Sequence, residues 1–490
     1  MPSRGPGRAA LGLLAAGMLL AGACAPVGPN YTPPVTKAPD AWHSKMEDGL
    51  KPGSPQAAEL ARWWVNLGDP TLTGLINQAV AGNLNLKQAM ARVRQARALR
   101  GVREAGLWPT VDAGALAQLH RDTASGDTGT IDQWYRAGFD AGWEIDVFGG
   151  VRRSIEASQA ELEASQANLR DVLISLTAEV ALNYVELRTY QNRRQTAQAN
   201  LKSQENTYGF IRSRHEAGLV NRLALEQARY NLENTRSQIP NLTSGVEAAM
   251  NRLAVLLGQA PGKLSARLAA PAPVPVPPPS VAVGVPTEAL RRRPDIRRAE
   301  RLLAAETARV GVAEAELYPK FRLAGSIGLA AVNSGDFLTP GTSGVWSVLP
   351  SMSWRVFDGG AIRSRIAAQT ALQEEFLLAY ETTVLSALEE VENNLTGYAQ
   401  EQMRRQSLRQ AVDAAKEAEM LSQDLFGAGL INFDSVLDAQ RSLLSFQDQL
   451  AISEGVVTAR LIALYKALGG GWGALPPAPS PPAPKAPAKQ

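Results

Sequence analysis

The chain has very little of the residues that disulfide, metal and redox chemistry require. Cys24 is the only cysteine among 490 residues, so an intrachain disulfide cannot form. His43, His120 and His215 are the only histidines, and they lack metal-ligand spacing. No Gly-rich phosphate loop follows a predicted strand. These absences argue against an enzyme and indicate neither a metal site nor a dissociable cofactor.

A strong excess of charge of one sign is also missing, because 50 Lys and Arg stand against 47 Asp and Glu. A surface that binds polyanions needs a clear basic excess, so nucleic acid is not an expected partner. The N-terminal apolar run from Ala9 to Leu20 is shorter than the roughly 20 residues of a membrane-spanning helix. It follows Arg4 and Arg8 and precedes small residues, which predicts a secretory signal peptide over residues 1–23.

The position of Cys24 directly after Ala21-Gly22-Ala23 resembles a bacterial lipobox, although Ala21 stands where leucine is more usual. In this interpretation the thiol receives a diacylglycerol, cleavage follows Ala23, and Cys24 becomes an N-acylated terminus. Ala25 fits sorting to the outer membrane. Buried acyl chains would anchor the protein without a spanning helix. The alternative is a cysteine discarded inside an ordinary signal peptide.

The sequence repeats itself at a nearly constant spacing, which predicts one structural unit used twice. The paired landmarks are Pro109 with Pro319 (319 − 109 = 210), Trp143 with Trp354 (354 − 143 = 211), and Gly218 with Gly429 (429 − 218 = 211). A Pro-rich segment, Pro271–Pro279, separates the halves. The predicted segments are the signal peptide (1–23), a lipid-anchored extended arm (24–60), the first repeat (61–258), a Pro-rich linker (259–286), the second repeat (287–469) and a disordered tail (470–490).

Most of each repeat has a helical pattern. Helices are predicted near residues 72–105 and 287–316, and longer ones over 153–218, 223–257 and 435–468, with another ending at Gly429. Seven-residue spacing indicates helices that supercoil against neighbours. It occurs in Ile155, Leu162, Leu169 and Leu176 and again in Leu377, Val384, Val391 and Tyr398. About 65 residues correspond to roughly 100 Å of helix, so a tall antiparallel helical pair is expected in each half.

Between these helices the period changes to two, which predicts strands with one apolar and one polar face. The predicted strands cover 135–147, 321–329 and 346–356, with a weaker one over 111–119. Their length suits a tilted bilayer crossing. Four strands cannot close a barrel, and membrane strands cannot leave open edges in lipid. Several chains must therefore pool their strands; a soluble sandwich is the alternative.

Glu144 and Asp146 have same-face spacing on a predicted strand. Paired carboxylates can perform acid–base catalysis. Here these carboxylates are better interpreted as lining the water-filled lumen of a channel.

The chain resembles the TolC-like outer-membrane factor family. Within that family it is most similar to the lipidated drug-efflux branch of OprM- and NodT-type proteins. The motifs that support the resemblance are Val27-Gly28-Pro29-Asn30-Tyr31 after Cys24, Trp63-Trp64, Asp69-Pro70, residues 143–149, residues 253–258, Arg292-Arg293-Pro294-Asp295-Ile296, and Leu437-Asp438-Ala439-Gln440-Arg441. The resemblance implies a mainly α homotrimer in the outer membrane that extends into the periplasm. Its twelve-stranded transmembrane β-barrel, four strands per chain, would continue into a periplasmic α-helical barrel.

The resemblance also implies a function. The chain would be the passive exit duct of a tripartite efflux system, receiving drugs or other small molecules from an inner-membrane pump, probably of the RND type, through a periplasmic adaptor protein. Two alternatives are the duct of a type I protein-secretion system and a lipid-anchored structural coiled coil.

The same resemblance places a periplasmic gate near Asp438, with Arg441 as a basic neighbour. Three copies of Asp438 around one axis would form an acidic ring that attracts cations. Ser435 and Ala224 stand where TolC has further acidic residues, so apolar closure by Phe433 or Val436 is expected to contribute.

Overall fold

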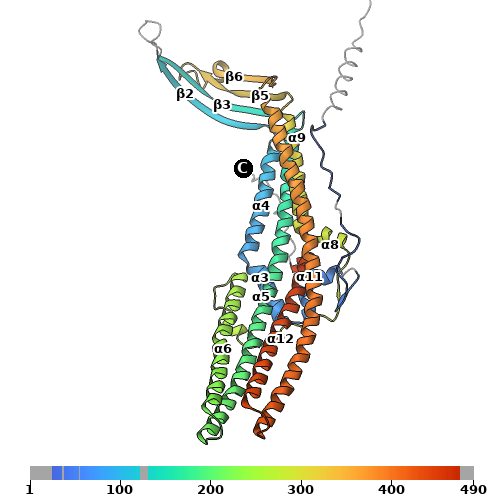
Figure 1. Ribbon diagram of the computed structural model, residues 1–490. Helices are drawn as coiled ribbons and strands as arrows, with labels where there is room; N and C mark the ends of the chain where they lie inside the picture. Colours follow the sequence, from blue (N-terminus) through green and yellow to red (C-terminus); the bar gives the residue numbers. More distant parts are fainter. Residues whose placement is uncertain (1–24, 36–37, 54–55, 122–130, 475–490) are drawn as a thin grey trace, which may run out of the picture. The chain divides into compact units, whose positions relative to one another are not determined.

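The computed structural model describes residues 25–35, 38–53, 56–121 and 131–474. The predicted signal peptide, Cys24 and most of the predicted tail lie outside the described residues and remain predictions. Figure 1 labels the main elements. Within the described helices, none combines the length and apolar character needed to cross a membrane.

The two repeats consist of matching elements. The first contains α3 (Pro70–Gly82), α4 (Leu84–Ala105), β2 (Thr110–Arg121), β3 (Ile131–Ile145), α5 (Gly150–Glu216) and α6 (Arg222–Leu256). The second contains α8 (Pro286–Arg292), α9 (Pro294–Ala315), β5 (Lys320–Ala331), β6 (Gly344–Ser353), α11 (Ala361–Gly427) and α12 (Phe433–Ala467). Helices α4 and α9 have 22 residues each, α5 and α11 have 67, and α6 and α12 have 35. The predicted internal repeat and its long helices are confirmed.

The first helical stretch of each repeat was predicted as continuous, and that prediction is wrong. In the first repeat Asn83 separates α3 from α4, where its Oδ1 accepts a hydrogen bond from Leu86 N at 2.9 Å. In the second, Arg293 separates α8 from α9 because Pro294 disfavours a helical conformation in the residue before it. Arg293 is extended, with φ −71° and ψ 124°.

Short elements lie in and around the predicted arm and linker, between β5 and β6, and at the start of the predicted tail. They are β1 (Leu50–Lys51), α2 (Ala57–Ala61), the 3-10 turn η1 (Trp63–Leu67), α7 (Ser265–Leu268), β4 (Val281–Ala282), α10 (Pro340–Ser343) and the 3-10 turn η2 (Trp472–Ala474). Strands β1 and β4 pair in parallel. The arm and the linker are therefore joined to each other by a small sheet.

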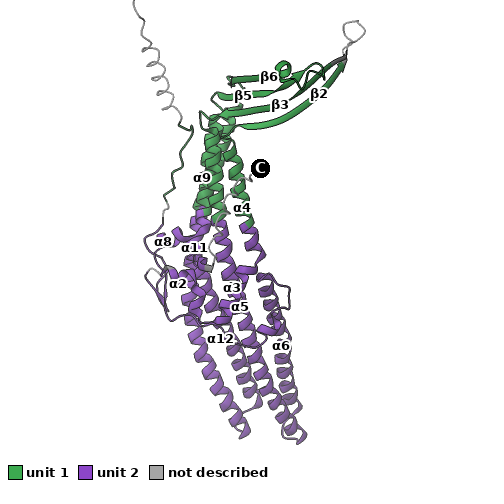
Figure 2. Ribbon diagram, turned by 180° about the vertical axis from the view of Figure 1, so that it is seen from behind, with its two compact units in different colours: residues 1–35, 91–166, 298–381 green, residues 36–90, 167–297, 382–490 purple. Residues whose placement is uncertain are grey.

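The chain divides into two compact units that do not coincide with the repeats (Figure 2). Unit 1 contains residues 1–35, 91–166 and 298–381, and unit 2 contains 36–90, 167–297 and 382–490. Each unit takes residues from both repeats. Unit 1 contains an antiparallel sheet in the order β2-β3-β5-β6, so the repeats meet between β3 and β5.

Unit 2 contains the main hydrophobic core, and two of its motifs have clear structural roles. The ring of Trp63 is buried and stacks on Tyr465 with centroids 5.5 Å apart. Asp69 caps α3 by accepting hydrogen bonds from Thr71 N and Leu72 N, and its other oxygen accepts the Tyr184 hydroxyl at 2.6 Å. Burial, followed by this hydrogen bond, raises the pKa of Tyr184.

Candidate functional site: the strand faces and the helical tip

The register of the four-stranded sheet aligns apolar residues with apolar residues, and polar with polar, in rows that run across the strands. One row consists of Ala113, Phe139, Ile327 and Trp346; the next consists of Asp112, Asp140, Ser326 and Ser347. Ser326 Oγ and Ser347 Oγ are 2.8 Å apart. Because successive residues of a strand face opposite sides, one face of the sheet is mainly apolar and the other mainly polar. The predicted alternation is confirmed.

Two strands end earlier than predicted. Strand β3 ends at Ile145, and Asp146 caps α5 instead of lining the polar face. Its Oδ1 accepts a hydrogen bond from Val151 N at 3.0 Å, and its Oδ2 accepts one from Arg152 N at 2.9 Å. Only Glu144 of the predicted acidic pair lies on a strand. The cause is local, because an Asp shortly before a helix satisfies its free N–H groups.

Strand β6 likewise ends at Ser353, before Trp354. The two repeat-related tryptophans make the same contact at the helical end of the sheet. Trp143 Nε1 donates to Leu107 O at 2.9 Å, and Trp354 Nε1 donates to Leu317 O at 3.0 Å. Each hydrogen bond ties the end of the second strand, or the residue just after it, to the turn before the first strand of the same repeat.

At the tip of unit 2, Arg441 joins α12 to α6. Its Nη1 lies 3.3 Å from Asp438 Oδ1, its Nε donates to Asn231 Oδ1 at 3.4 Å, and its Nη2 donates to the Tyr230 hydroxyl. The guanidinium carbon lies 5.2 Å from the centroid of the Tyr230 ring. The Asp438 side chain is 75% exposed. The structure therefore brings Asp438 and Arg441 together and leaves the carboxylate open to solvent.

The two apolar residues predicted to contribute to the gate, Phe433 and Val436, lie on the same helix α12 and are buried. Phe433 and Val436 are 6% and 2% exposed. They pack in the tip cluster, which we define as Ile211, Ala224, Ala228, Phe433, Val436 and Leu437. The ring of Phe426 lies 5.4 Å from that of Phe433. Both side chains thus stabilise the tip of a single chain rather than lying on an open face.

Sequence reasoning missed Tyr230, the partner of Arg441 on α6. The repeat contained the signal, because Tyr230 and Arg441 occupy equivalent positions (441 − 230 = 211). Comparing the two repeats residue by residue around Asp438 would have pointed to it.

The residues that follow Cys24 are held against unit 1, although Cys24 itself lies outside the described residues. Val27 N donates to Phe148 O at 3.0 Å. The buried Arg153 donates to Val27 O at 3.0 Å, Gly28 O at 3.0 Å and Asn30 Oδ1 at 2.8 Å. Gly28 has φ +88°, and a Cβ there would lie 2.4 Å from Gly311 Cα. The arm is therefore fixed within a few residues of the predicted lipid site.

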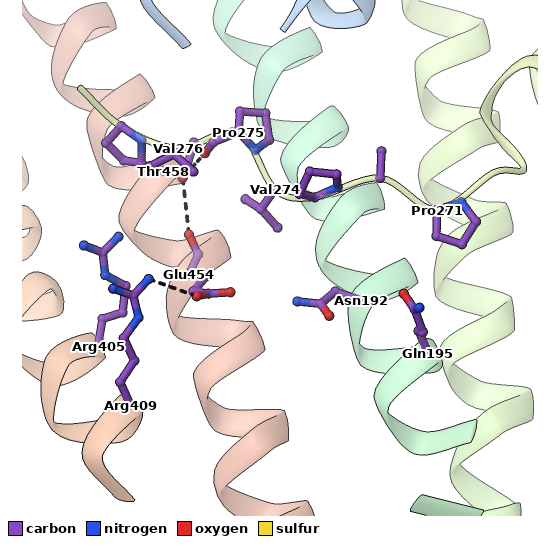
Figure 3. Close-up of a pocket in the computed structure, with 13 residues that line it drawn as sticks. Asn192, Gln195, Pro271, Val274, Pro275, Val276, Arg405, Arg409, Glu454 and Thr458 are labelled. Atoms are coloured by element: carbon purple, nitrogen blue, oxygen red, sulfur yellow. Dashed lines mark hydrogen bonds and ion pairs between the residues drawn. The ribbon is translucent and has the colours of Figure 1, made fainter. Parts of the chain in front are cut away.

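The Pro-rich linker borders a cavity of about 610 Å³ in unit 2 (Figure 3). Thr458 Oγ1 donates to Pro275 O at 2.9 Å, and Arg409 Nη2 lies 3.3 Å from Glu454 Oε1. Burial and the neighbouring Arg409 lower the pKa of Arg405. The cavity has no arrangement of catalytic groups of the kind that acid–base or nucleophilic chemistry requires.

Comparison with known protein families identifies the family to which this fold belongs. Residues 75–259 and 285–470 match the family described as outer membrane efflux protein, one match in each repeat. The chain belongs to this family. The resemblance inferred from the motifs is thereby confirmed.

Individual relatives of this efflux family agree. Nodulation protein T of Rhizobium leguminosarum bv. trifolii is 32% identical over 456 residues, which cover 91% of this chain and 94% of the relative. The toluene efflux pump outer membrane protein TtgF of Pseudomonas putida is 31% identical over 454 residues, 91% and 93% of the two chains. The structure of the outer-membrane channel OprN aligns with a TM-score of 0.86 at 36% identity, covering 91% and 99%.

These findings identify the protein as an outer-membrane efflux channel with a TolC-like fold. The predicted location in the outer membrane and the predicted transport function are confirmed at this level. The two faces of the sheet have a direct explanation in such a channel, since one would contact lipid and the other water.

Proposed function

We propose that three copies of this chain close into one channel of twelve strands, and that this channel is the passive exit duct of a tripartite efflux system. The observation that supports closure is the sheet order β2-β3-β5-β6, which leaves β2 and β6 as edges. In lipid, unpaired backbone groups at an edge cost several kcal/mol each, so only a closed ring of strands is stable. The apolar face needs lipid as well, because Phe139 and Trp346 are 57% and 78% exposed in a single chain.

The proposed duct has no catalytic step of its own. Small molecules would reach it from an inner-membrane pump, of the RND type, through a periplasmic adaptor protein. The proposal is supported by relatives such as TtgF, which is the outer membrane protein of a toluene efflux pump.

A lipid anchor at Cys24, with a diacylglycerol on the thiol and an acyl chain on the amine, is part of the proposal. The hydrogen bonds from Arg153 to Val27 and Gly28 support it, because they hold the arm close to the end of β3. A lipid attached two residues before Pro26 would then lie beside the membrane strands. Radioactive palmitate should label the wild type and not Cys24→Ser, and equal labelling would rule out the anchor.

The gate is proposed at the tip, where Asp438 and Arg441 would face their symmetry mates. The exposure of Asp438 supports this role, whereas Phe433 and Val436 act through the tip cluster that holds α12 in place.

The channel proposal is tested by reconstituting the full-length protein in planar bilayers and by native mass spectrometry in detergent. We expect three copies per particle and discrete conductance steps. A monodisperse single chain without conductance would contradict the proposal.

A second experiment tests the cargo. Deleting the gene in its own host should raise accumulation of small toxic molecules and leave secreted proteins unchanged. Loss of a secreted protein with unchanged accumulation would favour the protein-secretion alternative.

A further inference from the structure

The cavity of about 610 Å³ beside the Pro-rich linker in unit 2 takes its polar groups from three helices (Figure 3). The side chains that contribute them are Arg405 and Arg409 on α11, Glu454 and Thr458 on α12, and Asn192 and Gln195 on α5. The two arginines lie at one end and the two amides at the other. A cavity of this size suits an organic ligand or a few residues of a peptide.

The charged side chains that line this cavity do not balance. Two are arginines and one is a glutamate, so positive charge is in excess by one. Glu454 is engaged by Arg409, whose Nη2 lies 3.3 Å from its Oε1. Arg405 has neither an ion-pair nor a hydrogen-bond partner among the described residues. Burial, and after it the charge of Arg409, lowers the pKa of Arg405, and an anion beside the guanidinium would oppose both effects.

The opposite end of the cavity offers amide groups. The side chains of Asn192 and Gln195 make no hydrogen bond with other described residues. The same holds for the backbone N–H groups of Ala272, Val274 and Val276, which lie in a linker that is neither helix nor strand there. Amide groups both donate and accept hydrogen bonds, so they are suited to a ligand that itself contains amides.

The internal repeat shows that these groups are not part of the shared helical design. Arg409 corresponds to Gln198 (409 − 198 = 211), and Asn192 corresponds to Met403 (403 − 192 = 211). Neither Gln198 nor Met403 lines the cavity. Helices of equal length therefore carry the basic pair and this amide at the linker, and different side chains at the equivalent positions.

We propose that this cavity binds a short peptide segment with an acidic residue, whose carboxylate pairs with Arg405 and Arg409 and whose backbone amides bond to the opposite end. Guanidinium groups bind carboxylates through charge-assisted, often bidentate hydrogen bonds. A simple anion would use only the arginine end, and a neutral peptide only the amide end. The site lies within one chain and goes beyond the proposed duct, so it does not depend on closure of the channel.

A ligand-observed NMR titration of the full-length protein in detergent tests the arginine end. The probe is the peptide Glu-Ala-Ala, acetylated and amidated so that it carries one carboxylate. We expect saturable binding, and Gln-Ala-Ala with the same blocked ends should bind roughly tenfold more weakly, because hydrogen bonds to charged groups contribute more than neutral ones. Arg405→Gln should weaken binding of Glu-Ala-Ala by a similar factor.

Arg194→Gln is the matched control for that variant. Arg194 is the repeat counterpart of Arg405 (405 − 194 = 211) and does not line the cavity. It should bind Glu-Ala-Ala as the wild type does, and both variants should elute from a sizing column with the wild type. Equal losses in the two variants, or a wild type that does not bind the peptide, would overturn the site.

Asn192→Met tests the amide end by installing the residue of the other repeat. It should weaken binding of Glu-Ala-Ala several-fold and leave binding of acetate, which is too small to reach the amides, unchanged. Unchanged peptide binding in this variant would remove the amide end from the site. Acetate or inorganic phosphate that binds the wild type as tightly as Glu-Ala-Ala would show a simple anion site and overturn the peptide assignment.

Discussion

The two helical hairpins, α5–α6 and α11–α12, share one backbone design and differ in chemistry. Gly218 and Gly429 both have φ +73° at the turn, where a side chain would be strained, and helices of equal length precede and follow them. Asn221 and Asn432 then precede α6 and α12 respectively. The shared features are those that set helix length and reversal.

The two hairpins differ from the residue that follows each of these asparagines. Position 433 is a buried Phe in the second hairpin, whereas its counterpart Arg222 is exposed. Asn221 Oδ1 caps Ala224 N at 3.0 Å, but Asn432 makes no side-chain cap. Asp438 corresponds to Gln227. The two hairpins therefore share the lengths of their helices, and the second hairpin alone supplies a buried Phe and the exposed Asp438 at these positions.

The largest expected effect is the loss of stability when a charge is placed on the apolar face of the sheet. The strands of both repeats should show it to a similar extent. Phe139→Arg in β3 and Val348→Arg in β6 should each cost about 2 to 4 kcal/mol near the bilayer midplane, because a charge would enter lipid. Urea titration of folding into lipid vesicles measures this cost.

The control for that comparison is Ser347→Arg on the polar face, which should change conductance and leave stability nearly unchanged. Gly138, which alternates with Phe139 on β3, is not a suitable control position. A Cβ there would lie 2.6 Å from Ile327 O, so any side chain would disturb the β3–β5 pairing. Equal tolerance of Arg on both faces would contradict the transmembrane assignment.

The next largest effect separates the two tips. Phe433→Ala should destabilise the tip by about 3 kcal/mol, because it empties a buried position in the tip cluster. Arg222→Ala, its repeat counterpart, should stay within about 0.5 kcal/mol. Hydrogen exchange of the tip amides reports both changes. Similar exchange rates in the two variants would show that the hairpins are not energetically distinct.

A smaller difference in stability is expected between the N-terminal caps of α6 and α12. Asn221→Ala should cost about 1 kcal/mol, since it removes the acceptor of Ala224 N. Asn432→Ala should have little effect because no such bond exists there. The difference is measured as local exchange at the first turn of each helix, and a larger loss at position 432 would reverse the comparison.

The smallest energetic effect concerns the proposed gate. Asp438→Ala breaks an exposed ion pair that contributes less than about 1 kcal/mol. It should nevertheless give a more open or less cation-sensitive channel, because it removes the acidic ring. Gln227→Ala is the repeat-matched control. Single-channel recording decides, and unchanged conductance and cation block in Asp438→Ala would remove this residue from the gate.

Much of the fold was predictable from local patterns. Alternation identified all four strands of the sheet, and the 210–211 spacing identified the repeat. Local chemistry also explains the errors. Pro294 and Asn83 break helices that hydrophobic spacing alone would continue, and Asp146 caps a helix where alternation would extend a strand.

The sequence by itself determined the class of protein, the repeat, the two-faced strands and the long helices, because each depends on residues close together in the chain or on motifs in a constant order. Only the tertiary structure decided the partners of distant side chains. Phe433 and Val436 belong to the tip cluster, and Arg441 contacts Tyr230 some 211 positions earlier. Burial depends on which helices lie next to each other, and a linear pattern states only that a residue is apolar or charged.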